Sequence, residues 1–229
     1  MTGDQQPALQ ALTSFTASVG YDSRQTVLTV SGPGTQQPVA QLAKVGPVRA
    51  RAAYELFTGP TLNQPAGQVT PSGAQNTDGT AVGIVNLSAG RVADRDIHPM
   101  SGARHTYVVH NPALWRVVPT GSPPLTGHAV GRATRLCFNR LTDLSERTGI
   151  GLWTPDFLVS LTFQFSAPDS AGFTVTRLAR RARFEVTVAD PLLDRRLVLA
   201  CLTAMTALIT WTARAELTDM TSTFRPRQQ

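Results

Sequence analysis

Residues 173–211, FTVTRLARRARFEVTVADPLLDRRLVLACLTAMTALITW, contain the pattern that decides the fold. In residues 173–176 and again in 184–188, apolar β-branched or aromatic residues alternate with polar ones. This period of two is typical of strands that bury one face. Asp190 and Pro191 follow, and proline ends a strand because it lacks the amide hydrogen that a ladder needs. The stretch therefore predicts two strands joined by a short basic connection.

The sequence after Pro191 changes from alternation to continuous apolarity. Residues 197–213 contain no charged side chain, which predicts one helix from about Leu192 to about Arg214. Asp190 is a candidate for its N-cap. Such a helix needs burial on all sides, and its alanines suit strands that approach closely. We expect a mainly β protein, a closed antiparallel β-barrel wrapped around this C-terminal helix, with one or two short extra helices. A membrane span is the alternative, because the run is at the short limit for one.

The same region is similar to the C-terminal end of LURP-one-related and phospholipid-scramblase-like proteins. The matching motifs are Gly172-Phe-x-Val-x-Arg177, Arg183-Phe-x-Val-x-Val188, Asp190-Pro191 and Asp194-Arg-Arg-Leu-Val-Leu-Ala200. Upstream, Tyr54-Glu-Leu-Phe57 with Ala66-Gly-Gln-Val69, Tyr107-Val-Val109 with Leu114-Trp-Arg-Val-Val118, and Gly127-His-Ala-Val-Gly131 resemble the family's strand units. The resemblance implies the tubby C-terminal fold, a closed barrel around a central hydrophobic helix.

The chain also departs from this family. Membrane scramblases are associated with clusters of palmitoylated cysteines, whereas Cys137 and Cys201 are far apart in the sequence. They are also associated with an acidic calcium-binding segment, whereas residues 190–196 place two carboxylates beside two arginines. That is a poor site for a cation that takes six or more oxygen ligands. We expect neither calcium binding nor lipid scrambling. Both cysteines are expected to be small buried hydrophobes, and a disulfide between them stays open.

Length and composition bound the organisation and the partners. The 229 residues suit a single domain, 1–229, with a loop insertion at 59–79 and a frayed tail at 215–229. The net charge of +6 comes almost entirely from arginine, Lys44 being the only lysine. A basic chain favours an anionic partner, although arginine-rich usage also fits a GC-rich, bacterial-like composition. The first residues do not read as a signal peptide, so the cytoplasm is the expected location.

Motifs that carry known chemistry are missing from the sequence. The histidines, His98, His105, His110 and His128, have spacings that fit no common zinc motif. No nucleophile elbow, phosphate loop or dinucleotide fingerprint is present. We therefore expect no metal site and no cofactor, and the chain is more consistent with a binding protein than with an enzyme.

The basic connection between the two C-terminal strands is the best candidate for ligand binding. Its arginines are Arg177, Arg180, Arg181 and Arg183. Paired guanidinium groups bind phosphate in a bidentate manner, and tubby-like domains are associated with phosphoinositides. The leading hypothesis is thus a non-catalytic binding or scaffold domain for anionic phospholipid head groups or another anionic ligand, with no nucleic acid expected. The simpler alternative is a solvated hairpin whose charges protect a strand edge.

A second functional hypothesis places an apolar pocket in or at the mouth of the barrel. Its candidate residues are His105, Tyr107, Trp115 and Trp153. Under this hypothesis the protein is a small-molecule enzyme, for example a cyclase or an isomerase. A helix that fills the barrel would leave little room for a substrate, which favours the first hypothesis.

Overall fold

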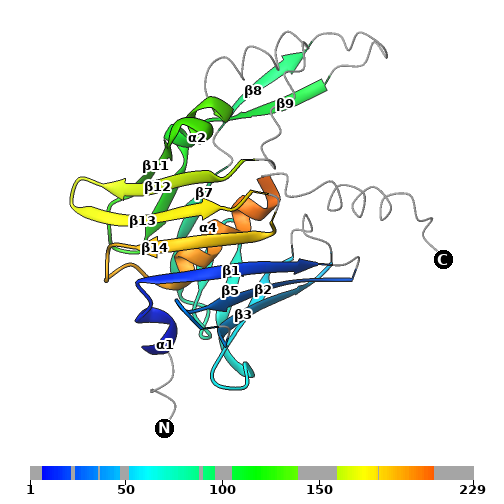
Figure 1. The fold of residues 1–229 in the computed structure, drawn as a ribbon, viewed down its shortest axis with the longest axis vertical. Coiled ribbons are helices and arrows are strands. Elements are labelled where there is room, and N and C mark those ends of the chain that lie inside the picture. The colour runs from blue at the N-terminus through cyan, green and yellow to red at the C-terminus, as the bar shows by residue number, and fades with distance from the viewer. Residues whose placement is uncertain are drawn as a thin grey trace, which may run out of the picture.

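The structure is a computed structural model of the 229-residue chain. It describes residues 7–21, 24–35, 37–46, 52–87, 90–95, 105–138, 159–179 and 181–208. Two sheets are present in these ranges, a closed barrel and a separate two-stranded sheet. Figure 1 shows the barrel with the two-stranded sheet projecting beyond it.

The barrel is antiparallel and closes between its first and last strands, β1 and β14. Its strands in chain order are β1 Ser14–Tyr21, β2 Gln25–Ser31, β3 Pro38–Val45, β4 Tyr54–Thr58, β5 Gln64–Thr70, β6 Gly73–Gln75, β7 Ala81–Asn86, β10 Arg116–Pro119, β11 Leu125–Val130, β12 Leu161–Ala167, β13 Ser170–Arg177 and β14 Arg183–Val188. The two-stranded sheet pairs β8 Gly90–Arg95 with β9 His105–His110. The helices within the described residues are α1 Pro7–Gln10, the 3-10 turn η1 Pro112–Leu114, α2 Arg132–Cys137 and α4 Arg195–Leu208.

The C-terminal helix α4 lies inside the barrel, as the sequence predicts (Figure 1). Every residue from Arg195 to Thr206 is buried, and α4 packs against β5, β6, β7 and β10. The barrel wall comes close to the helix at Gly83, where a Cβ atom would lie 2.9 Å from a methyl carbon of Leu197. A helix without a polar face is stable here because the inward-facing residues of the strands surround it.

The two ends of the barrel carry different elements. One end, which we call the α1 end, holds α1, the start of α4 and the connections 32–37, 59–63, 76–80, 120–124, 168–169 and 189–194. The other end, which we call the hairpin end, holds the connection 178–182 between β13 and β14. α4 points toward the hairpin end, where α2 and the β8–β9 sheet also lie (Figure 1).

The start of α4 differs from the expected one. The helix begins at Arg195 instead of Leu192, and Leu192 is 94% exposed. Asp190 is not its N-cap, since the Asp190 carboxylate accepts a hydrogen bond from the amide of Leu192 at 2.9 Å. The chain needs residues 191–194 to turn from the barrel wall into the interior, and only then can the helix start. The N-cap is Asp194, whose Oδ1 accepts from the Arg196 amide at 2.8 Å.

The expectation of a loop insertion at 59–79 is wrong, because β5 and β6 in this segment are strands of the barrel wall. Its glycines suggested a loop, but two of them serve the wall itself. Gly67 has φ +126, and a Cβ there would lie 2.2 Å from the Gln75 carbonyl oxygen. Gly73 has φ +158, with a Cβ position 2.4 Å from the Gly83 oxygen. Glycine is the residue that allows strands to approach this closely. The tail 215–229 lies outside the described residues.

Candidate functional site

Arg177 does not belong to a surface cluster, contrary to the sequence hypothesis. It shares the inward face of β13 with Phe173 and Val175, and its side chain is fully buried. Its Nη2 donates a hydrogen bond to the Val159 carbonyl oxygen at 2.9 Å. Arg177 is therefore a part of the barrel interior at the hairpin end, where it holds the chain that enters β12.

Two of the remaining arginines, Arg181 and Arg183, lie on the outside of the barrel. Arg181 is exposed, and Arg183 is half-buried on the outer face of β14, in register with Ser18. Arg180 lies outside the described residues. The connection is tight, since the amide of Leu178 donates to the Arg183 oxygen at 3.0 Å. The surface candidate is thus smaller than the sequence suggested and is centred on Arg181 and Arg183.

The residues of the alternative apolar pocket are not brought together in the described part of the chain. Trp115 is fully buried, with its ring centroid 5.0 Å from that of Phe163 and 5.9 Å from that of Phe138. It fills the barrel core, and Gly127 leaves room for it, because a Cβ there would lie 3.1 Å from the Trp115 Cβ. His105 and Tyr107 are on β9, in the separate sheet. Trp153 lies outside the described residues.

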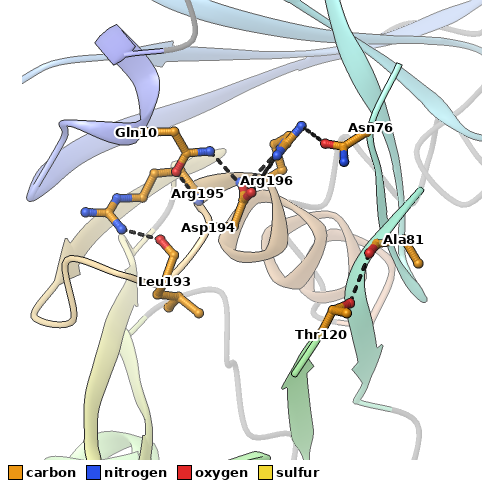
Figure 2. A network of polar contacts seen from close by, with 8 residues as sticks. All are labelled: Gln10, Asn76, Ala81, Thr120, Leu193, Asp194, Arg195 and Arg196. Carbon is orange, nitrogen blue, oxygen red and sulfur yellow. Dashed lines mark hydrogen bonds and ion pairs between the residues drawn. The ribbon is translucent and has the colours of Figure 1, made fainter. Parts of the chain in front are cut away.

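The structure reveals a polar network at the α1 end that no sequence pattern predicted (Figure 2). Asp194 is its centre. The Asp194 Oδ1 accepts from Gln10 Nε2 at 2.8 Å, and its Oδ2 pairs with Arg196 Nη2 at 2.6 Å. Gln10 Oε1 also accepts a hydrogen bond from the amide of Arg195 at 3.0 Å, so a side chain of α1 helps to cap the start of α4 at this end of the barrel. Arg196 Nη1 donates to the Asn76 side chain.

The second arginine of this network is satisfied by main-chain oxygens. Arg195 is 1% exposed. Its Nε donates to the Leu12 oxygen at 2.7 Å, and its Nη1 donates to the oxygens of Asp190 and Leu193. Two cations at a helix N-terminus oppose the helix dipole. The capping carboxylate and these carbonyl oxygens offset that cost, so the network joins α1, the turn 190–194 and α4 into a closed barrel end.

Carboxyl groups at the α1 end are held in their charged form. Burial by itself would raise the pKa of Asp194, but hydrogen bonds from Arg196 and Gln10 outweigh it, and the pKa is lowered. The pKa of Asp190 is lowered chiefly by the hydrogen bond from the Ser170 hydroxyl. With both of its oxygens occupied by donors, Asp194 acts as a structural cap.

A third interior cation lies toward the hairpin end. Lys44 is 5% exposed, and its Nζ lies 4.7 Å from the centroid of the Tyr54 ring, a cation–π contact. Tyr54 is fully buried, and this burial raises its pKa to about 12. The only lysine of the chain therefore packs against the barrel core and adds nothing to an outer surface.

The cysteines are free in the structure, Cys201 buried in α4 and Cys137 half-buried at the end of α2. Of the four histidines, His128 is exposed on β11, His105 and His110 are at the two ends of β9, and His98 lies outside the described residues. Within the described ranges, no three His, Cys, Asp or Glu side chains are placed to hold a metal ion.

No helix in the described part of the chain has the length and apolarity that crossing a membrane requires. Comparison of the chain with protein-family models, with curated proteins and with solved structures gives no match.

Proposed function

We propose that this chain is a non-catalytic binding module for an anionic ligand, with anionic lipid head groups as the preferred class. The observation that carries the proposal is a contrast between surface and interior. Arg181 is exposed in the β13–β14 connection and Arg183 is half-buried on the outer face of β14, with its Nε buried, whereas the barrel interior is occupied by α4 and by aromatic side chains. Exposed guanidinium groups suit phosphate oxygens because they donate two parallel hydrogen bonds.

The enzyme hypothesis has less support. It needs a cavity near Trp115, yet that ring is packed against Phe138, Phe163 and Phe165. His105 and Tyr107, two of its other pocket candidates, belong to a different sheet from the barrel. Among the described residues, the candidates of this hypothesis therefore do not place a titratable side chain beside the apolar surroundings of Trp115.

The proposal extends to family and location. An α-helix enclosed by a closed antiparallel barrel is what a tubby-like, LURP-one-related or scramblase-like domain would have, and this architecture supports such a relationship. In the cytoplasm, the proposed location, a basic surface meets an anionic membrane leaflet, where each arginine near the surface contributes about 1 kcal/mol of attraction.

The test is a charge-removing variant with a charge-keeping control. Arg180, Arg181 and Arg183 are changed together to Gln in one protein and to Lys in the other. Binding is measured by co-sedimentation with phosphatidylserine-containing vesicles and with phosphatidylcholine vesicles, at low and at physiological salt. We expect the Gln variant to lose about a hundredfold in affinity at low salt. The Lys variant should stay close to wild type, and binding should weaken as salt rises.

Two further outcomes decide the proposal. Inorganic pyrophosphate is added as a soluble competitor. If the arginines form a phosphate-specific site, pyrophosphate should release the protein from the vesicles. If the attraction is a diffuse surface effect, pyrophosphate should release the protein only as much as any salt of the same ionic strength. If the wild-type protein shows no affinity for the anionic vesicles even at low salt, the proposal is wrong.

A further inference from the structure

The two ends of the barrel differ in the sign of their charge. The connections at the α1 end, 32–37, 59–63, 76–80, 120–124, 168–169 and 189–194, contain no lysine or arginine. They contain four carboxylates, of which Asp78 and Asp169 are exposed and Asp190 and Asp194 are half-buried. The two arginines that follow, Arg195 and Arg196, are buried within the polar network. Since Asp194 is paired with Arg196, the negative charge that the α1 end presents to solvent comes mainly from Asp78 and Asp169.

The hairpin end presents positive charge. Arg24 in the β1–β2 connection is exposed, and so are Arg132 and Arg135 on α2. Arg181 in the β13–β14 connection and Arg183 at the start of β14 lie on the same end.

Three of the five large exposed hydrophobic side chains among the described residues lie at this same end. Among the described residues, the large exposed hydrophobics are Val45, Ile84, Leu114, Leu136 and Leu192. Val45, 83% exposed, ends β3, Leu114 is in η1 just before β10, and Leu136 is on α2. All three lie at the hairpin end, while Ile84 is on the outer wall and Leu192 is at the α1 end. Basic residues interspersed with exposed leucine and valine are what a surface that enters the head-group region of an anionic bilayer needs.

We infer that the barrel docks end-on, with its hairpin end against an anionic membrane and its acidic α1 end facing the aqueous phase. This inference rests on the proposed function and gives it a surface and an orientation. The arginines contact lipid phosphates, and Leu114, Leu136 and Val45 enter the boundary between head groups and acyl chains. The acidic α1 end is repelled by the same membrane, so charge fixes which end approaches.

A second copy of the chain is the competing occupant, because the acidic end of one barrel could meet the basic end of another. The distribution of apolar side chains favours the membrane. In a head-to-tail contact, Val45, Leu114 and Leu136 of one copy would face the α1 end of the next. Among the described residues, Leu192 is the only large exposed hydrophobic at that end, so most of this apolar surface would have no apolar partner.

The orientation is tested by site-specific fluorescence on the full chain. In a Cys137→Ser background, Leu136→Cys reports on the hairpin end, and Leu192→Cys is its matched control at the α1 end. Both positions are exposed, 61% and 94% respectively, so neither change disturbs the core. Each cysteine carries an environment-sensitive nitrobenzoxadiazole label, and the vesicles contain phosphatidylserine and a spin-labelled quencher lipid. We expect the label at position 136 to brighten at least about twofold on vesicles and to be quenched by that lipid, with no response at position 192.

A binding measurement supports the fluorescence. Replacing Leu114 and Leu136 together with Ser should weaken vesicle binding about tenfold, whereas Leu192→Ser should leave it unchanged. If the protein binds vesicles but both labels respond equally, or only the one at position 192, the end-on orientation is wrong and the proposed function stands. Light scattering could instead show self-association at low salt while the label at position 136 does not respond to vesicles. That result would mean that the hairpin end of one copy binds the α1 end of another, and the membrane orientation would be wrong. Absence of any vesicle binding would overturn the proposed function and the orientation together.

Discussion

Replacing Asp194 with Asn tests whether the network at the α1 end holds α4 in the barrel. The Asp194 carboxylate accepts the Arg196 amide and Gln10 Nε2 through Oδ1, each at 2.8 Å, and it pairs with Arg196 Nη2 through Oδ2 at 2.6 Å. Asparagine keeps one oxygen for the cap. It loses the charge and the second acceptor, so the Arg196 guanidinium is left largely buried without its anion.

The magnitude follows from burial. A hydrogen bond to a charged group contributes about 1.5–3 kcal/mol, and breaking a fully buried ion pair costs about 3–5 kcal/mol. The side chain of Asp194 is 25% exposed and that of Arg196 is 9% exposed, so water screens the pair in part. We therefore expect Asp194→Asn to lower the free energy of unfolding by about 2 kcal/mol. Asp194→Ala should cost about 3 kcal/mol, because it also removes the N-cap, which contributes about 1 kcal/mol.

The pH dependence gives the sharper result. The pKa of Asp194 is lower in the folded chain than its ordinary value of 3.8. The charged carboxylate thus stabilises the fold fully above about pH 4, and this contribution is lost as the pH falls through the folded-state pKa. Asparagine does not titrate, so the difference between wild type and variant should shrink toward pH 2–3. Urea denaturation at pH 7 and pH 3 measures it. A variant as stable as wild type at pH 7, or a difference that is unchanged at pH 3, would refute this account of the network.

Two further predictions concern α4. Leu199→Ala should lower the free energy of unfolding by about 2–5 kcal/mol, since Leu199 is fully buried inside the barrel; Leu192→Ala, the exposed control, should change it by less than about 0.5 kcal/mol in the same urea titration. Cys201 should not react with a thiol reagent in the native protein, because burial raises the pKa of its thiol far above the ordinary value. The half-buried Cys137 should react faster, and equal rates in native protein would contradict the enclosed position of α4.

Local patterns were enough to predict the strands β13 and β14 and the buried helix that follows. The same alternation contained information about the arginines. Arg177 is two and four residues from Val175 and Phe173, so it shares their face and points inward, while Arg183 precedes Phe184 and points outward. Grouping these arginines by their closeness in sequence was therefore an error that the period of two could have prevented.

Glycine content was a less reliable guide. Residues 59–79 resemble a loop by composition, yet they contribute β5 and β6 to the barrel. Whether Gly67 marks a turn or a close approach between strands depends on its neighbour, here the main chain at Gln75, and local composition does not specify that neighbour.

The sequence by itself determined the barrel and the helix within it, because periodicity and apolarity act over a few residues and survive in any arrangement of the chain. The tertiary structure alone decided where charge is collected. Gln10 meets Asp194 across 184 residues of sequence, and Arg24 shares an end of the barrel with Arg132 and Arg181 only because the antiparallel strands return there. Such contacts depend on strand order and register, which arise from the packing of the whole chain. For that reason the polar network and the charge difference between the two ends could be seen only once the barrel had closed.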